Sequence, residues 1–190
     1  MRNKIFTAIC VLIWFSAANQ LPAQEQPRLI VGIVVDQLRY ADLQRYHNRL
    51  SENGFKRLSR KGIAYTNAFY NNLINNAPVS HATIATGAPP SLHGITGREW
   101  YQALQDHVIS CIYDTESQAV GSPGARGHKS PALLQAPSFA DKIRLQSNFQ
   151  ARVYGIGFMD HDAIISSGQM ADAAYWFDRQ TGKWITSTFY

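Results

Sequence analysis

Carboxylates follow two apolar runs of the sequence, at the points where strands are expected to end. Asp36 comes directly after residues 29–35, and the cluster Asp-His-Asp at 160–162 follows residues 151–158. Because ligands bind beyond the carboxyl ends of strands in open α/β sheets, Asp36 is a candidate metal ligand or acid/base. It is equally a candidate N-cap for a following helix, and spacing alone leaves both roles open. The 160–162 cluster could bind a metal at the same edge, although an isolated Asp-His-Asp in a loop is common.

A serine and a histidine lie together at the start of an expected helix. The segment 75–81 reads Asn-Asn-Ala-Pro-Val-Ser-His, and the free N–H groups of a helix N-terminus form a natural anion site. Ser80 and His81 are a nucleophile and a base by residue type. Adjacent helical residues do not face each other, however. The pattern therefore favours a packing serine and a hydrogen-bonded buried histidine over a catalytic pair.

The elements that must position these groups alternate between strand and helix. Expected strands cover 29–35, 63–70 and 151–158; expected helices cover 40–61 (one kinked helix or two short ones), 78–87 and 139–146; and a hairpin joins 174–177 to 183–189. Residues 102–136 are rich in Gly and Pro and predict a long loop. The order β-α-β-α-β predicts an α/β fold, with a parallel central sheet and helices on both faces.

The overall composition is that of a globular domain. The chain has 190 residues, of which 45% are apolar and 16% charged, and this balance excludes a disordered tail or a coiled coil. The formal charge is +5, but the basic residues are scattered, and the densest group (56–61) is typical of a solvated helix face. We therefore expect no nucleic-acid partner. Cys111 is expected to be a small buried hydrophobe.

The first residues have the pattern of a secretory leader. A short cationic start precedes an apolar run at 5–15 and the small residues at 16–18, which predicts a signal peptide over residues 1–23. The apolar run is shorter than the roughly 20 residues that a membrane span needs, so we expect no stable membrane anchor. The expected location is secreted or periplasmic, with one domain over residues 24–190.

Five stretches share their motifs with one family: residues 30–39, 54–58, 80–87, 90–97 and 175–189. They resemble the alkaline-phosphatase superfamily, in its type I phosphodiesterase/nucleotide pyrophosphatase-like branch. The greatest similarity is to bacterial periplasmic zinc phosphatases with a threonine nucleophile. The resemblance covers nearly all of the chain beyond the leader. It implies that this chain is the amino-terminal part of an alkaline-phosphatase-like domain.

The resemblance implies a zinc-dependent phosphoryl transfer, in which two metal ions clamp the substrate. The family's metal-binding aspartate at the end of the first strand matches Asp36. Its nucleophilic threonine falls on Ala77, which has no hydroxyl group. The nearest hydroxyl belongs to Ser80, about one helical turn further on.

The family's phosphate-binding positions also differ in this sequence. The phosphate-holding asparagine falls on Arg98, and the Lys-x-Arg clamp falls on Met159 and His161. The remaining metal ligands of the family would come after residue 190. Since zinc takes three or four protein ligands, we expect the two-ion zinc centre not to bind stably to this chain alone.

Three functional hypotheses follow from these residues. The first is a phosphatase/phosphodiesterase-family protein that is inactive or truncated. The alternative is a secreted anion-binding module, in which Arg98, His161 and helix N–H groups hold phosphate or a phosphate ester. The third is a working hydrolase that uses Ser80 or a metal-bound water.

Overall fold

The computed structural model describes residues 27–104, 106–123 and 127–190. The chain divides into two units, Met1–Val34 and Val35–Tyr190. In the first unit, the described residues have no regular secondary structure and are exposed. The signal peptide predicted at 1–23 lies outside the described residues. Within the described ranges, no helix combines the length and the apolar character that a membrane span requires.

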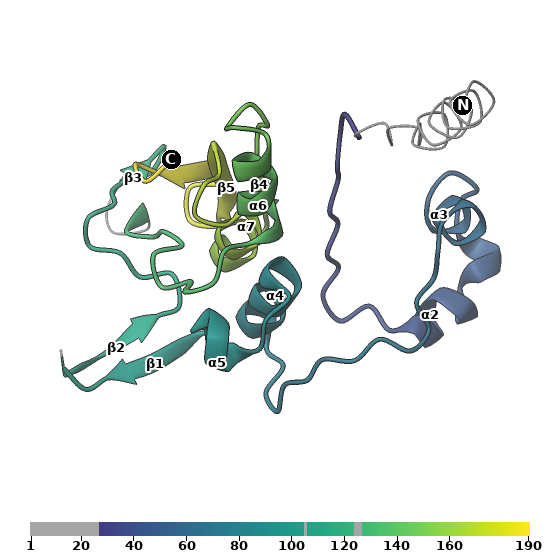
Figure 1. The fold of residues 1–190 in the computed structure, drawn as a ribbon, viewed down its shortest axis with the longest axis horizontal. Coiled ribbons are helices and arrows are strands. Elements are labelled where there is room, and N and C mark those ends of the chain that lie inside the picture. The colour runs from purple at the N-terminus through teal and green to yellow at the C-terminus, as the bar shows by residue number, and fades with distance from the viewer. Residues whose placement is uncertain (1–26, 105, 124–126) are drawn as a thin grey trace, which may run out of the picture. The chain divides into compact units, whose positions relative to one another are not determined.

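A four-stranded sheet organises the second unit (Figure 1). Its order is β3-β6-β5-β4, formed by β3 (Ala119–Val120), β6 (Lys183–Ser187), β5 (Ala173–Asp178) and β4 (Tyr154–Gly157). β4 and β5 are parallel, whereas β5 and β6 form the predicted antiparallel hairpin and β3 pairs antiparallel with β6. The predicted α/β class is therefore confirmed, but the described sheet is mixed, with β4–β5 as its parallel pair.

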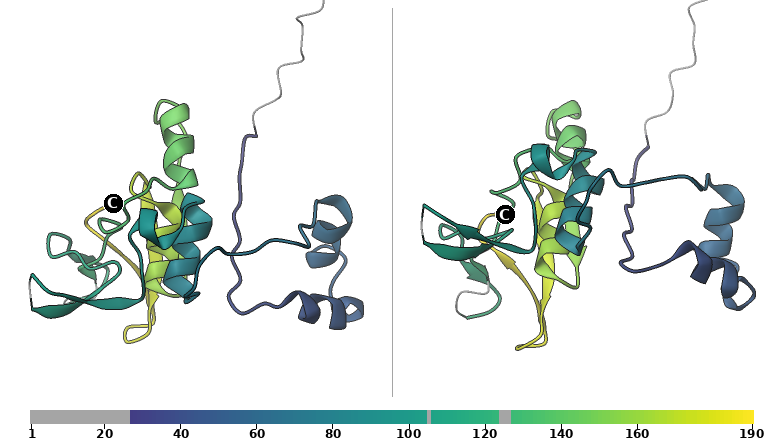
Figure 2. Two further views of the ribbon diagram at one scale, coloured as in Figure 1. Left: turned by 60° about the horizontal axis from the view of Figure 1, so that its bottom comes forward. Right: turned by 90° about the horizontal axis from the view of Figure 1, so that it is seen from below.

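Two helices build the layer that carries the site. Helix α7 (Asp160–Ser167) connects β4 to β5 and packs on both strands, and helix α4 (Ala77–Thr86) packs on α7 (Figure 2). The two helices and the sheet share one apolar core, to which α4 contributes Ala82, α7 contributes Ile164 and Ile165, and the sheet contributes Trp176. Burial of this surface holds the two helices together, since each large apolar side chain contributes about 1.5–3 kcal/mol.

Local signals in the sequence predict most of the helices correctly. The expected helical region 40–61 is two short α-helices with a 3₁₀ turn between them; the elements are α2 (Tyr40–Arg45), η1 (His47–Arg49) and α3 (Phe55–Lys61). Helix α4 ends at Gly87, which adopts φ 68°, a left-handed conformation that glycine reaches without a steric cost. Helix α6 (Phe139–Gln146) starts at the predicted N-cap, Ser138.

Two predicted strands are absent from the described structure. Residues 29–35 and 63–70 form no strand, and their apolar side chains are exposed, as in Ile33 (76%) and Phe69 (84%). The reason is physical: a strand must exchange backbone hydrogen bonds with a neighbour, and neither segment has one among the described residues.

Several elements of the described structure were not predicted. Residues 160–162, expected in a loop, form the first turn of α7. The short helix α5 (Pro90–His93) follows α4, and β1 (Glu99–Gln102) and β2 (His107–Ser110) form a separate two-stranded sheet that extends into the predicted loop region.

Helix α6 begins with a buried capping box. The Ser138 hydroxyl accepts a hydrogen bond from the Asp141 N–H, and Asp141 Oδ2 accepts one from the Ser138 N–H at 2.7 Å. Asp141 Oδ1 also accepts a hydrogen bond from the Met170 N–H at 2.7 Å. One carboxylate therefore joins α6 to the segment between α7 and β5.

We predict that Asp141→Ala lowers the free energy of unfolding by about 3 kcal/mol, because the buried Ser138 N–H and the half-buried Met170 N–H each lose a partner at about 1–3 kcal/mol. Urea denaturation at neutral pH measures the change. Lys142→Ala, at an exposed position of the same helix, is the matched control and should stay within about 0.5 kcal/mol of the wild type. Equal effects of the two substitutions would contradict the structural role of the capping box.

Asp172 lies just before β5, and its carboxylate forms ion pairs with two arginines. Its carboxylate accepts hydrogen bonds from the Val153 N–H at 2.7 Å and the Arg152 guanidinium at 2.7 Å, and it also pairs with Arg144. Desolvation would raise the pKa of this carboxyl, but the three donors outweigh it and hold the pKa well below its usual range.

A carboxyl whose pKa is depressed in the folded state stabilises the fold above its unfolded pKa, and this contribution is lost as the pH falls toward the folded pKa. We therefore predict that Asp172→Asn destabilises the protein at pH 7 and that the difference from the wild type shrinks below about pH 4. Denaturant midpoints measured from pH 7 to pH 2 test this. A difference that is independent of pH would contradict the assignment.

Candidate functional site

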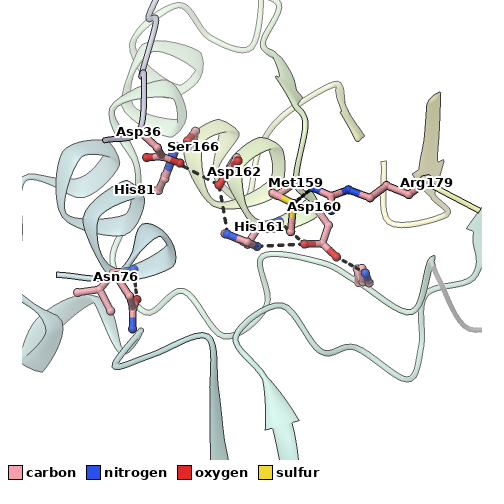
Figure 3. A network of polar contacts seen from close by, with 11 residues as sticks. Asp36, Asn76, His81, Met159, Asp160, His161, Asp162, Ser166 and Arg179 are labelled. Atoms are coloured by element: carbon pink, nitrogen blue, oxygen red, sulfur yellow. Dashed lines mark hydrogen bonds and ion pairs between the residues drawn. The ribbon is translucent and has the colours of Figure 1, made fainter. Parts of the chain in front are cut away.

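Three potential metal ligands from distant parts of the sequence converge in the second unit (Figure 3). Asp36 comes from the segment before α2, His81 from α4 and Asp162 from α7, and one donor atom of each lies within 4.8 Å of the others. His81 Nε2 is 3.4 Å from Asp36 Oδ1 and 3.4 Å from Asp162 Oδ1. The imidazole thus lies between two carboxylates.

Helix α7 presents two of its side chains to one histidine. Asp162 and Ser166 are four residues apart and therefore share a face of the helix. His81 spans them: Nδ1 is 2.8 Å from Ser166 Oγ, and Nε2 points toward Asp162. The hydrogen bond at Nδ1 orients the ring, and the side chain is only 5% exposed.

The backbone turns sharply immediately after Asp36. Gln37 has φ 61°, in the left-handed region that non-glycine residues seldom occupy. Such conformations cost energy and are concentrated at functional sites. The Asp36 side chain is 44% exposed and therefore forms the solvent side of the cluster.

His161 belongs to a second group of charged residues beside the first. Its Nδ1 is 3.1 Å from Asp160 Oδ1, and its Nε2 is 3.2 Å from Asp162 Oδ1. Lys129 forms an ion pair with Asp160. Burial would raise the pKa of Asp160, but the hydrogen bond from His161 and the Lys129 charge outweigh it and keep this pKa well below its usual range.

Several buried polar atoms at the centre of this region have no hydrogen-bond partner among the described residues. They are His81 Nε2, His161 Nε2 and Asp162 Oδ1. Because an unsatisfied buried polar group costs about 1–3 kcal/mol, three such atoms within one cluster suggest that a further group completes it. The donor set of imidazole and carboxylate fits a divalent transition metal such as zinc.

The position to which the resemblance assigns the family's nucleophile is the first residue of α4. Ala77 follows the N-cap Asn76, whose side chain accepts a hydrogen bond from the Val79 N–H at 3.3 Å. A methyl group therefore stands where the resemblance places a hydroxyl. Ser80 lies on the same helix, but the hydrogen-bonding hydroxyl at the His81 ring belongs to Ser166.

The two residues predicted to bind phosphate lie in different settings. Arg98 is exposed and directly precedes β1. His161 is buried, with a carboxylate at each ring nitrogen. No hydrogen bond joins the two side chains in the described part of the chain. Met159, at the other clamp position, is the N-cap of α7 and its sulfur accepts a hydrogen bond from Arg179.

Sequence reasoning anticipated part of this cluster. It predicted Asp36 and residues 160–162 at one edge of the fold, and the structure brings Asp36 and Asp162 within 4.8 Å. It did not predict that His81 joins them. The spacing of Asp162 and Ser166 was the available signal, but it becomes visible only once residues 160–167 are recognised as a helix.

The buried cysteine of the described chain, Cys111, is not part of the site. Cys111 is 1% exposed, and its burial raises the pKa of the thiol to about 12. The thiol therefore stays protonated at physiological pH, and only the thiolate is a strong nucleophile. This confirms the prediction of a small buried hydrophobe at this position.

Comparison with known protein families decides the assignment. The model of the type I phosphodiesterase / nucleotide pyrophosphatase family matches residues 30–187. The chain belongs to this family. It is 35% identical over 99% of its length to alkaline phosphatase PafA of Elizabethkingia meningoseptica and 34% identical over its full length to alkaline phosphatase PhoV of Synechococcus elongatus. It is also 39% identical over its full length to a calcium-transporting ATPase of Myroides odoratus.

The three-dimensional comparison agrees with the sequence. A crystal structure of PafA matches with a TM-score of 0.85 and 37% identity, over 88% of this chain and 32% of that one. The resemblance to the alkaline-phosphatase superfamily is thereby confirmed. The chain spans 34–37% of the length of the three relatives named above.

Two glycines allow β4 to approach the helix that carries the site. A Cβ at Gly155 would lie 2.4 Å from the Ala163 carbonyl oxygen, and one at Gly157 would lie 2.7 Å from the Ala163 nitrogen and 2.9 Å from Asp162 Cβ. Backbone atoms cannot give way as a flexible side chain would. The first turn of α7 is therefore held at a distance that only glycine permits.

We predict that Gly157→Ala lowers the free energy of unfolding by about 1–3 kcal/mol, the usual effect of overpacking, because the new methyl group must push α7 away from β4. Denaturant unfolding measures the loss. Gly32→Ala is the control, because a Cβ there meets nothing within 4 Å. A Gly157→Ala protein as stable as the Gly32→Ala protein would show that α7 is not held this closely.

Proposed function

We propose that this chain is part of a metal-dependent phosphoric-ester hydrolase of its family that has lost the ability to form a phosphoenzyme. The observation that carries the proposal is Ala77 at the first position of α4. A phosphoenzyme needs an oxygen or other nucleophilic atom that attacks phosphorus, and a methyl group has none. The chain around this position, from Asn76 to the helix cap Gly87, keeps the shape of an anion-binding helix start.

The charged surroundings support the same proposal. In an active relative of the resembled branch, a Lys-x-Arg pair would hold the substrate phosphate. Here Met159 is neutral, and His161 lies between two carboxylates that repel an anion. This makes an intact phosphate clamp at residues 159–161 unfavourable, and it favours the inactive hydrolase over the anion-binding module.

Metal chemistry in the family would be supplied by two zinc ions, which polarise the phosphoryl group and lower the pKa of the attacking hydroxyl. Of the residues that this chain contributes, Asp36 matches a family ligand, and His81 and Asp162 lie within reach of it. Two zinc ions need six or more protein ligands in total. We therefore propose that these residues do not assemble the two-ion centre by themselves.

The predicted leader supports an extracytoplasmic location for the protein. Residues 1–23 have the cationic start, short apolar run and small residues of a signal peptide. We propose that the protein is secreted or periplasmic and that its ligand, where it binds one, is phosphate or a phosphate ester.

We predict that the chain with added zinc does not hydrolyse aryl phosphate monoesters or diesters above the zinc-only blank, because it lacks the nucleophile. Release of the chromogenic phenol over several hours measures this. Zinc-dependent hydrolysis that Asp36→Ala abolishes would overturn the proposal. Loss of such hydrolysis in Ser80→Ala, but not in the exposed control Ser91→Ala, would assign the nucleophile to Ser80.

The anion-binding module is tested with inorganic phosphate in the same preparation. Phosphate that raises the melting temperature of the wild-type chain, but not of Arg98→Ala, would favour the module. An unchanged melting temperature in both would count against it.

A further inference from the structure

We propose that Asp36, His81 and Asp162 form a binding site for a single divalent transition-metal ion of the zinc class, within this chain alone. The proposal concerns one ion and is compatible with the expectation that the two-ion zinc centre does not bind stably to this chain alone. It does not depend on the proposed function, because a chain can hold one ion whether or not it hydrolyses a phosphate ester.

The distances between the donor atoms fit such an ion. Two ligands that each lie about 2.1 Å from a tetrahedral ion are about 3.4 Å apart. His81 Nε2 lies 3.4 Å from Asp36 Oδ1 and 3.4 Å from Asp162 Oδ1. The two pairs of donor atoms that include His81 Nε2 therefore already have the spacing of a tetrahedral site. The third pair, Asp36 with Asp162, lies within 4.8 Å.

The imidazole is held in the orientation that a metal ligand needs. His81 Nδ1 is 2.8 Å from Ser166 Oγ, so an Nδ1–H that donates to this hydroxyl leaves the lone pair on Nε2. Metal-bound histidines are oriented in this way through their second nitrogen. The Nε2 atom is buried and has no hydrogen-bond partner among the described residues, although it points at two carboxylate oxygens.

A lone pair that faces two carboxylates is repulsive unless a positive charge lies between them. A proton on Nε2 would be one such charge, but the carboxylate oxygens at 3.4 Å are far from the optimum near 2.9 Å for an N–H donor. A metal ion satisfies His81 Nε2 and Asp162 Oδ1 at once. The buried unpartnered atoms therefore favour the ion over the proton.

The donor types select the class of ion. Calcium and magnesium prefer sites made of oxygen atoms, whereas one imidazole with two carboxylates suits zinc and its neighbours. His161 Nε2 lies 3.2 Å from the same Asp162 oxygen and adds a second imidazole beside the site. Asp36 is 44% exposed, so the ion can enter from that side and keep a water at its fourth position.

The test is zinc binding to the untagged, full-length chain, measured by titration calorimetry after treatment with a chelator. We expect one ion per chain. Asp36→Asn, His81→Gln and Asp162→Asn should each weaken binding more than about 100-fold. Ser166→Ala should weaken it by about 10- to 100-fold, since it removes only the orientation of a ligand.

Two exposed substitutions serve as matched controls: His47→Gln and Glu116→Gln should leave the affinity unchanged. Cobalt(II) bound to the wild-type chain should show the intense visible absorption of a tetrahedral site. Asp36→Asn is the decisive variant, because this half-exposed side chain can change without disturbing the core. Absence of stoichiometric binding to the wild type, or equal affinity in Asp36→Asn, would overturn the proposal.

Discussion

The close packing of helix α7 on strand β4 is the contact on which the site depends. It requires Gly155 and Gly157, because a side chain at either position would collide with backbone or Cβ atoms of the helix. Helix α4 packs on α7 in turn, and His81 lies against Asp162 and Ser166. Gly155 and Gly157 therefore determine where α7 places the side chains of Asp162 and Ser166.

The sequence correctly predicted the helix ends that depend on contacts between residues close together in the chain. Ser138 marks the start of helix α6, because its hydroxyl accepts a hydrogen bond from the N–H of Asp141, three residues further on. Gly87 marks the end of α4, because its left-handed conformation closes the last turn of the helix. Residues 29–35 and 63–70 have strand-like composition but no strand, because a strand is completed by a partner elsewhere in the chain. The contact of His81 with Asp162 is likewise set by packing between two helices, so sequence alone could not place it.

The chain combines lost and retained features of its family. If the resemblance places the family's residues correctly, Ala77 lacks the nucleophile's hydroxyl, Met159 and His161 stand at the phosphate clamp, and Asp36 keeps the metal-binding carboxylate. The clustering of acidic groups around two histidines favours positive rather than negative ligands. Under the proposed function, the loss of anion-binding groups and the retention of cation-binding ones would go together in one region of the fold.

The burial of Cys111 makes this thiol a sensor of structural opening. A thiol-specific reagent reaches its sulfur only when the surrounding core, which includes Ile112 and Leu134, separates. Under conditions where reclosing is faster than labelling, the reaction rate follows the equilibrium population of the open form. The rate at which Cys111 reacts therefore measures the local stability of the core, without the need to introduce a cysteine by mutation.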